Sequence, residues 1–321
     1  MPLNSSKKRK KALTIAIPIM CACIAFVIVL TTVIIPKQKY NKAMRLLDSD
    51  DYDSAYVLFE EIGSDEAIAS NKYDRAIALI DSGDYKSAYT LLNKLNYKDS
   101  EAKRLEIRPN YQKMLFSKAT VGSTVFFGAY EQDNDTSNGK EDIEWLVLAK
   151  SGNKMLVISK YALDAQSYST EATATWETSS LRTWANDTFL KAAFSANEQK
   201  RILSANVSAD ENPVWTVDPG NATIDKVFLL SITEAEKYFA TNESRRCSQT
   251  AYVKARSSST SSRGTTADDE TACGWGLRSP GMNQFHFANV LGDGSIYCDG
   301  FRVGRHRPFF RPAMWIEFGN E

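Results

Sequence analysis

An uncharged apolar run close to the N-terminus constrains this chain more than any other feature. The run extends from Ala12 to Ile35 and contains no charged side chain. As a helix it would extend about 36 Å at about 1.5 Å per residue, enough to cross the roughly 30 Å hydrocarbon core of a bilayer. It ends at Ile35-Pro36 without a small-residue cleavage pattern. The run therefore favours an uncleaved membrane anchor over a signal peptide.

The charges beside this run predict its orientation. Residues 7–11 are all Lys or Arg, and the basic end of a membrane anchor stays in the cytoplasm. Basic residues also follow the run between 37 and 45 and weaken this bias without reversing it. We therefore expect a cytoplasmic tail at 1–11, a single-pass transmembrane anchor at 12–36 and an extracellular location for the C-terminal domain.

Residues 40–106 repeat themselves. Tyr40–Phe59 aligns with Tyr73–Leu92 at a period of about 33–34 residues, which is that of tetratricopeptide arrays. Apolar residues recur at helical spacing, and Asp-rich breaks at 48–51 and 81–84 supply turns and caps. The Trp and the Leu-Gly of the tetratricopeptide motif are missing. Because about three repeats are needed for independent stability, we expect a short helical stalk rather than a peptide-binding groove.

Residues 121–318 show a different pattern. Strand signals occur at 124–129, 143–149, 154–159 and 225–230, and helix signals at 179–192, at 197–203 and from Thr233. Residues 206–223 give no clear pattern. Short strands, two or three helices and long loops predict an α+β domain with antiparallel pairing.

The segment between Trp275 and Trp315 stands out within this domain. It begins and ends as a strand, but between these strands it mixes aromatic, basic, Gly and Asp residues with no helical period. Both histidines of the chain lie here. Such a segment is typical of a binding surface, although buried aromatics at the edge of a core are the alternative. We expect ligand contacts from Phe285, His286, Phe287, Asn289, Leu291, Asp293, Tyr297, Asp299, Phe301, Arg302, Arg305, His306, Arg307, Phe309 and Phe310.

The frame around this segment resembles a known family. The motifs in order are IEWLVLA (143–149), MLVISKYALD (155–164), WETSSLRTWAN (176–186), AFSANE (193–198), DKVFLLS (225–231), RRCSQTAY (245–252), WGLRSPG (275–281) and RPAMWI (311–316). They are similar to a bacterial surface domain of uncharacterised function. That domain is related to the C-type-lectin fold shared with formylglycine-generating enzymes and phage major tropism determinants. The resemblance covers 121–318 and implies a C-type-lectin-like head.

The cysteines and the acidic residues offer candidate disulfide and calcium sites. Cys247 and Cys273 could form a disulfide outside the membrane, or both could remain thiols. Residues 133–144 approach the spacing of a calcium loop, but Gly139 is one place late and strands flank the segment, so a polar hairpin loop is expected. Four residues could ligate calcium, but no sugar-binding tripeptide accompanies them: Asn283, Asn289, Asp293 and Asp299. We expect no metal and no cofactor.

These observations together predict a membrane-anchored ligand-binding protein that is not an enzyme. The balance of 39 acidic and 39 basic residues excludes general attraction to nucleic acid, so the expected partner is an extracellular protein or glycan. Two alternatives remain. One is an oxidoreductase head of the formylglycine-generating type, and the other is an envelope scaffold that works through its helical repeats.

One compositional gap suggests how the predicted ligand segment arose. The lectin-fold resemblance extends to variable proteins of diversity-generating retroelements, whose binding residues come from template adenines, commonly in asparagine codons such as AAC. Substituting those adenines never yields Lys, Glu, Gln, Trp or Met. None of these residues occurs from Phe285 to Arg311. The segment is therefore expected to be hypervariable, and the alternative is a fixed hairpin that happens to be rich in aromatic residues.

Overall fold

The computed structural model describes residues 24–93, 95–256 and 272–318. The predicted basic tail and residues 12–23 of the predicted anchor lie outside these ranges. Residues 24–29 are helical and lead into a π-helical turn, η1 (Leu30–Ile34). Among the described residues, no helix is both long enough and apolar enough to span a bilayer. The anchor therefore stays a prediction.

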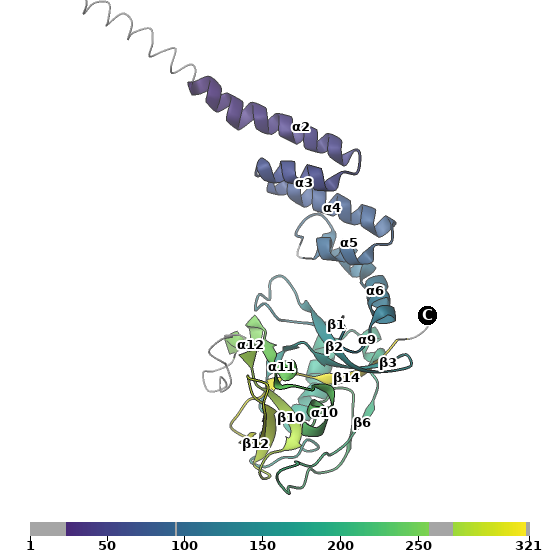
Figure 1. Ribbon diagram of the computed structural model, residues 1–321, viewed down its shortest axis with the longest axis vertical. Coiled ribbons are helices and arrows are strands. Elements are labelled where there is room, and N and C mark those ends of the chain that lie inside the picture. Colours follow the sequence, from purple (N-terminus) through teal and green to yellow (C-terminus); the bar gives the residue numbers. More distant parts are fainter. Residues whose placement is uncertain (1–23, 94, 257–271, 319–321) are drawn as a thin grey trace, which may run out of the picture. The chain divides into compact units, whose positions relative to one another are not determined.

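The chain divides into two compact units, residues 1–111 and 112–321 (Figure 1). The first unit is helical, and its consecutive helices pack against one another from α2 to α5. Helix α6 continues past the boundary into the second unit. The helices are α2 (Ile35–Leu47), α3 (Tyr52–Glu61), α4 (Asp65–Asp81), α5 (Tyr85–Leu92) and α6 (Ser100–Lys118).

The two sequence repeats have matching caps and matching contacts. Asp51 caps α3 by accepting a hydrogen bond from the Ser54 N–H at 3.2 Å, and Asp84 caps α5 by accepting one from the Ser87 N–H at 3.1 Å. The predicted Asp-rich turns are thus found where the pattern placed them. Small residues at the contacts let neighbouring helices approach closely. The equivalent alanines of both repeats are fully buried: Ala43, Ala55, Ala76 and Ala88.

The second unit is built on a four-stranded antiparallel sheet with the order β1-β2-β3-β14. The last strand of the chain pairs with β3, where Trp315 lies opposite Leu156, so the beginning and the end of the unit share one sheet. The predicted strands at 124–129, 143–149 and 154–159 are confirmed. The strands are β1 (Thr124–Tyr130), β2 (Glu141–Ser151), β3 (Lys154–Ser159) and β14 (Ala313–Glu317).

A second, three-stranded antiparallel sheet has the order β10-β11-β12, with β10 (Trp275–Pro280), β11 (His286–Val290) and β12 (Ile296–Arg302). Short strands complete the unit. They are β4 (Tyr161–Ala162), β8 (Cys247–Gln249) and β9 (Ala272–Cys273) in one sheet, and β5 (Asp164–Ala165) with β13 (Phe309–Phe310) in another.

The predicted strand at 225–230 is largely wrong. β6 (Ala205–Val207) pairs with β7 (Thr223–Asp225), so the strand ends where the prediction begins. Beyond Asp225 only Phe228 makes a bridge, to Ala313. Residues 227–230 are nevertheless buried. A buried apolar run gives no periodic signal that separates a strand from an extended segment inside the core.

Helices cap and fill the spaces between these sheets. The predicted helix at 179–192 is continuous but contains a π-helical turn, and Leu181, Ala185 and Phe189 form its buried face. Ser195 and Ser231 begin α9 and α10 with capping boxes to Glu198 and Glu234. The elements are α7 (Ser180–Trp184), η2 (Ala185–Phe189), α8 (Leu190–Ala193), α9 (Ala196–Arg201), α10 (Ile232–Tyr238), α11 (Asn242–Arg245) and α12 (Ala251–Arg256).

A single hydrophobic core joins both sheets of the second unit. Trp145 from the first sheet and Trp275 from the second are both fully buried in it. Each indole N–H donates to a backbone carbonyl, of Phe127 at 2.7 Å and of Arg245 at 2.9 Å. The predicted α+β class with antiparallel strands is confirmed.

Candidate functional site

The predicted ligand segment forms a β-hairpin and the loop that follows it. β11 is the middle strand of its sheet, and all of its residues are buried. β12 is an edge strand, and most of its side chains are half-exposed. The segment therefore separates into a core part and a surface part.

Five predicted ligand residues are buried, so the structure places them in the core rather than on a surface: His286, Phe287, Asn289, Phe309 and Phe310. Phe287 stacks on Tyr168 with ring centroids 4.5 Å apart. Phe310 makes edge-to-face contact with Trp184 at 5.1 Å. Because other elements cover β11 and β13, their aromatic side chains stabilise the core instead of meeting solvent.

His286 lies at the border between these parts. Its side chain is almost fully buried, and Nδ1 is 2.6 Å from Oδ1 of Asn283. Burial lowers the pKa of His286, and the positive charges of Arg302 and His306 lower it further. The buried ring, held against Asn283, offers little surface to a ligand.

The remaining predicted residues on and around β12 are half-exposed or exposed, although Phe301 also packs against the core. They are here called the β12 surface: Phe285, Tyr297, Asp299, Phe301, Arg302, Arg305, His306 and Arg307. The β11–β12 register shifts between the pairs Phe287–Phe301 and Asn289–Tyr297, so regular alternation does not hold along β12. The Phe301 ring is 5.3 Å from Tyr297 and 5.0 Å from His306. Phe285 is 51% exposed. An aromatic row with arginines at its end is the composition of protein-binding surfaces.

Leu291 and Asp293 lie in the turn between β11 and β12, beyond the Tyr297 end of the aromatic row. The Asp293 carboxylate accepts hydrogen bonds from the N–H and the hydroxyl of Ser295, at 2.9 and 2.6 Å. Arg245 binds the same turn through the Gly294 carbonyl at 2.8 Å. These contacts give Asp293 a role in the turn.

The sequence did not indicate Trp215, which borders the β12 surface. Its indole N–H donates to Oδ1 of Asp299 at 2.8 Å, and the ring is 40% exposed. Asn212 fixes this loop by donating to the carbonyls of Pro280 and Cys298 at 2.9 and 2.8 Å. The loop also lines an open cavity of about 550 Å³. In the sequence its only signal was a tryptophan in an unpatterned stretch.

One family model matches the chain over most of its second unit. The model of a domain of unknown function (DUF6273) matches residues 152–318, which is more than half of the chain. The chain belongs to this family. No curated protein and no solved structure matches it. The match begins before β3 and includes the whole β12 surface, whereas β1 and β2 precede it.

Inside the DUF6273 domain, Cys247 and Cys273 lie opposite one another in β8 and β9. They are not joined by a disulfide in the structure, which has the second of the two alternatives that the sequence left open, a pair of thiols. Burial raises the pKa of the Cys247 thiol, but its hydrogen bond with Cys273 and the charge of Arg311 outweigh burial and lower the pKa to about 7. Cys298 lies apart on β12, and burial raises its pKa.

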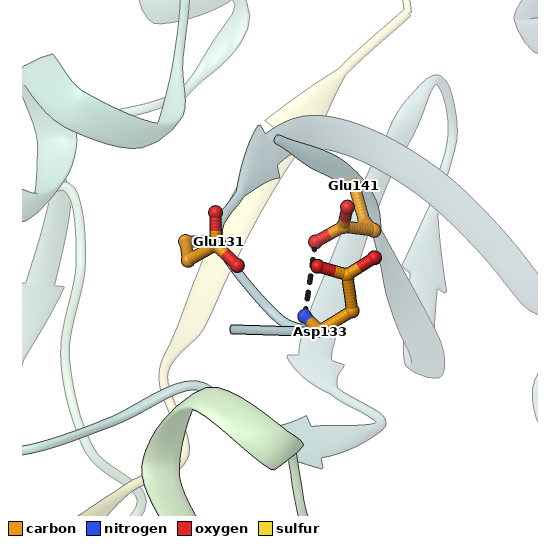
Figure 2. A group of neighbouring side chains, drawn as sticks. All are labelled: Glu131, Asp133 and Glu141. Atoms are coloured by element: carbon orange, nitrogen blue, oxygen red, sulfur yellow. Dashed lines mark hydrogen bonds between the residues drawn. The ribbon is translucent and has the colours of Figure 1, made fainter. Parts of the chain in front are cut away.

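A group of acidic side chains lies just before the residues that match the DUF6273 family. Glu131 and Asp133, from the loop after β1, come together with Glu141, the first residue of β2, and Figure 2 shows their carboxylates facing one another. Glu144, a member of the calcium-loop spacing in the sequence, instead pairs with Lys160 at 2.8 Å. The expected polar hairpin loop is present, but it gathers a different set of acids, which includes Glu131.

Proposed function

We propose that this chain binds an extracellular protein or glycan through the β12 surface. The observation that carries the proposal is the row Tyr297–Phe301–His306, which runs from the edge strand β12 into the loop after it and is accompanied by exposed arginines and by Trp215. An aromatic side chain can bury on the order of 150–250 Å² at about 25 cal/mol per Å². A few such residues are enough for micromolar affinity after association costs.

The fold and the location belong to the same proposal. The order of motifs from 143 to 316 supports a C-type-lectin-like head, and the mixed antiparallel architecture is compatible with it. The apolar run at 12–36 and the basic residues before it support a single-pass anchor with the head outside the cell. In this arrangement the helical repeats act as a stalk that holds the head away from the membrane.

We restrict the proposed diversification by a retroelement to the exposed side chains of residues 285–311. Exposed side chains on a fixed frame can vary without loss of the fold, which is the logic of an antibody paratope. Buried positions cannot, because changes of volume in a core destabilise it. We therefore propose that variation is concentrated in the β12 surface and spares Phe287 and Phe310.

Sequencing the gene's neighbourhood tests this diversification. A reverse-transcriptase gene and a near-identical template repeat should lie close by, and the two copies should differ only at template adenines. The mismatched codons should include those of Tyr297, Phe301 and Arg302. Absence of a repeat, or equal variation in the 176–186 motif among related copies, would leave only a fixed ligand site.

Ligand binding itself is tested by screening the full chain in nanodiscs against a glycan array and a panel of extracellular proteins. The double variant Phe301→Ala/Arg302→Ala should lose at least about tenfold in affinity for any ligand found, as expected for hot-spot side chains. Ile224→Ala is the matched control, because Ile224 is 65% exposed and lies outside the β12 surface. Equal binding by the double variant and the control would contradict the proposal.

An oxidoreductase head is the second candidate, because the lowered pKa of Cys247 is a property of reactive thiols. Both Cys247 and Cys273 are buried, however, whereas catalytic thiols are partly exposed. The exposed aromatic and basic row is open to a large partner without any rearrangement. Ligand binding is therefore the function that the geometry supports best.

A further inference from the structure

The acidic group between β1 and β2 contains a buried carboxylate of which one oxygen has no hydrogen-bond partner among the described residues. Glu131 is 8% exposed. Its Oε1 atom is inaccessible to solvent and has no hydrogen-bond partner among the described residues. Leaving a charged oxygen buried and unpaired costs several kcal/mol unless a cation or a donor satisfies it. Figure 2 shows that this carboxylate points toward Asp133 and Glu141.

The other two carboxylates are held in place by the loop itself. Oε2 of Glu141 accepts hydrogen bonds from the N–H groups of Gln132 and Asp133 at 2.7 and 3.2 Å. Asp133 accepts from the N–H of Asp135 at 3.0 Å and from the Asn138 side chain at 3.0 Å. The nearby Lys140 points elsewhere and donates to the Ala192 carbonyl at 2.7 Å. Hydrogen bonds within the loop therefore already orient the Asp133 and Glu141 carboxylates.

We infer that Glu131, Asp133 and Glu141 form a divalent-cation site that binds Ca²⁺. One ligand oxygen from each side chain lies within 4.8 Å of the other two. A Ca²⁺–oxygen distance is about 2.4 Å, so one ion can contact all three, with water and carbonyl oxygens filling its usual six to eight positions. Mg²⁺ demands a near-ideal octahedron with bonds of about 2.1 Å, whereas Ca²⁺ tolerates the irregular geometry of three carboxylates supplied by a loop and a strand end.

The charges agree with this assignment. Three carboxylates gathered this closely repel one another, and a bound cation relieves that repulsion. The site lies before residue 152 and so outside the family match. It is also remote in sequence from the β12 surface and does not depend on the proposed ligand.

Calcium titration of the full chain tests the site. Calorimetry with CaCl₂ should give a Kd of about 10⁻⁴–10⁻³ M, the range of extracellular calcium modules. In 10 mM CaCl₂ the midpoint of thermal unfolding, followed by tryptophan fluorescence, should rise by a few degrees relative to EDTA. MgCl₂ at the same concentration should produce a smaller shift. An equal shift with MgCl₂ would overturn the choice of calcium.

Variants separate a cation site from a merely structural loop. Glu131→Gln keeps the shape but removes the charge, so it should weaken calcium binding at least about tenfold. In EDTA the same variant should unfold at a temperature equal to or above that of the wild type, because like-charge repulsion is reduced. Glu144→Gln is the matched control on β2 and should bind calcium normally, since Glu144 pairs with Lys160.

Three results would refute the inference. The first is a wild-type chain that shows neither heat of binding nor a thermal shift in 10 mM CaCl₂. The second is a Glu131→Gln variant that binds calcium as tightly as the wild type. The third is a loss of binding in Asp135→Asn but not in Glu131→Gln, which would assign the ion to the calcium-loop spacing at 133–144 instead.

Discussion

Replacing Arg278 with methionine should lower the free energy of unfolding of the second unit by about 3–5 kcal/mol. The Arg278 side chain is 2% exposed and forms ion pairs with Asp210 and Glu234. It also donates to the carbonyls of Ser208 and Leu229 at 3.0 and 2.9 Å. Loss of the guanidinium removes the charge that compensates two carboxylates and leaves the buried Leu229 carbonyl without this donor.

Urea unfolding followed by tryptophan fluorescence measures this effect cleanly. All 6 tryptophans of the chain lie beyond residue 111, so the signal reports the second unit alone. Arg302→Met is the matched control, because Arg302 is an exposed arginine of the same segment and should change stability by less than about 0.5 kcal/mol. If both variants unfold at the same urea concentration, the buried ion pairs contribute nothing net.

Replacing Trp275 with alanine should cost about 3–5 kcal/mol, whereas Phe301→Ala should change stability little. Trp275 is 0% exposed and fills the core between Phe239 and the guanidinium of Arg311, which lies 4.9 Å from its ring. Its indole N–H also holds the Arg245 carbonyl. Phe301 is half-exposed, so its removal opens no comparable cavity.

Thermal unfolding of the two variants side by side checks this contrast. Trp275→Ala should lower the unfolding temperature by several degrees or more, and five tryptophans remain to report it. Phe301→Ala should remain within about 2 °C of the wild type. A Phe301→Ala variant as unstable as Trp275→Ala would place Phe301 in the core, and the β12 surface would lose its central residue.

Much of the candidate site could not be predicted because its residues meet only through tertiary contacts. The segment 285–310 looked like one surface because no period separated its buried residues from its exposed ones. Phe287 is buried by Tyr168, more than 100 positions away, and Phe310 by Trp184. Trp215 reaches Asp299 from a stretch without any pattern. A local sequence pattern reflects only the neighbours of a residue along the chain, and it carries no information on tertiary contacts of this kind.

The sequence by itself determined the elements whose signals are local. Short runs of apolar residues marked β1 and β3, helical spacing marked 179–192, and equivalent aspartates marked the caps of α3 and α5, because each signal depends on residues close together in the chain. Only the tertiary structure decided which residues distant in the sequence interact. Cys247 lies opposite Cys273, and Phe287 and Phe310 are buried in the core. The Glu131 carboxylate lies beside those of Asp133 and Glu141. Burial and electrostatic environment come from neighbours far away in the chain, and they appear only when the chain folds.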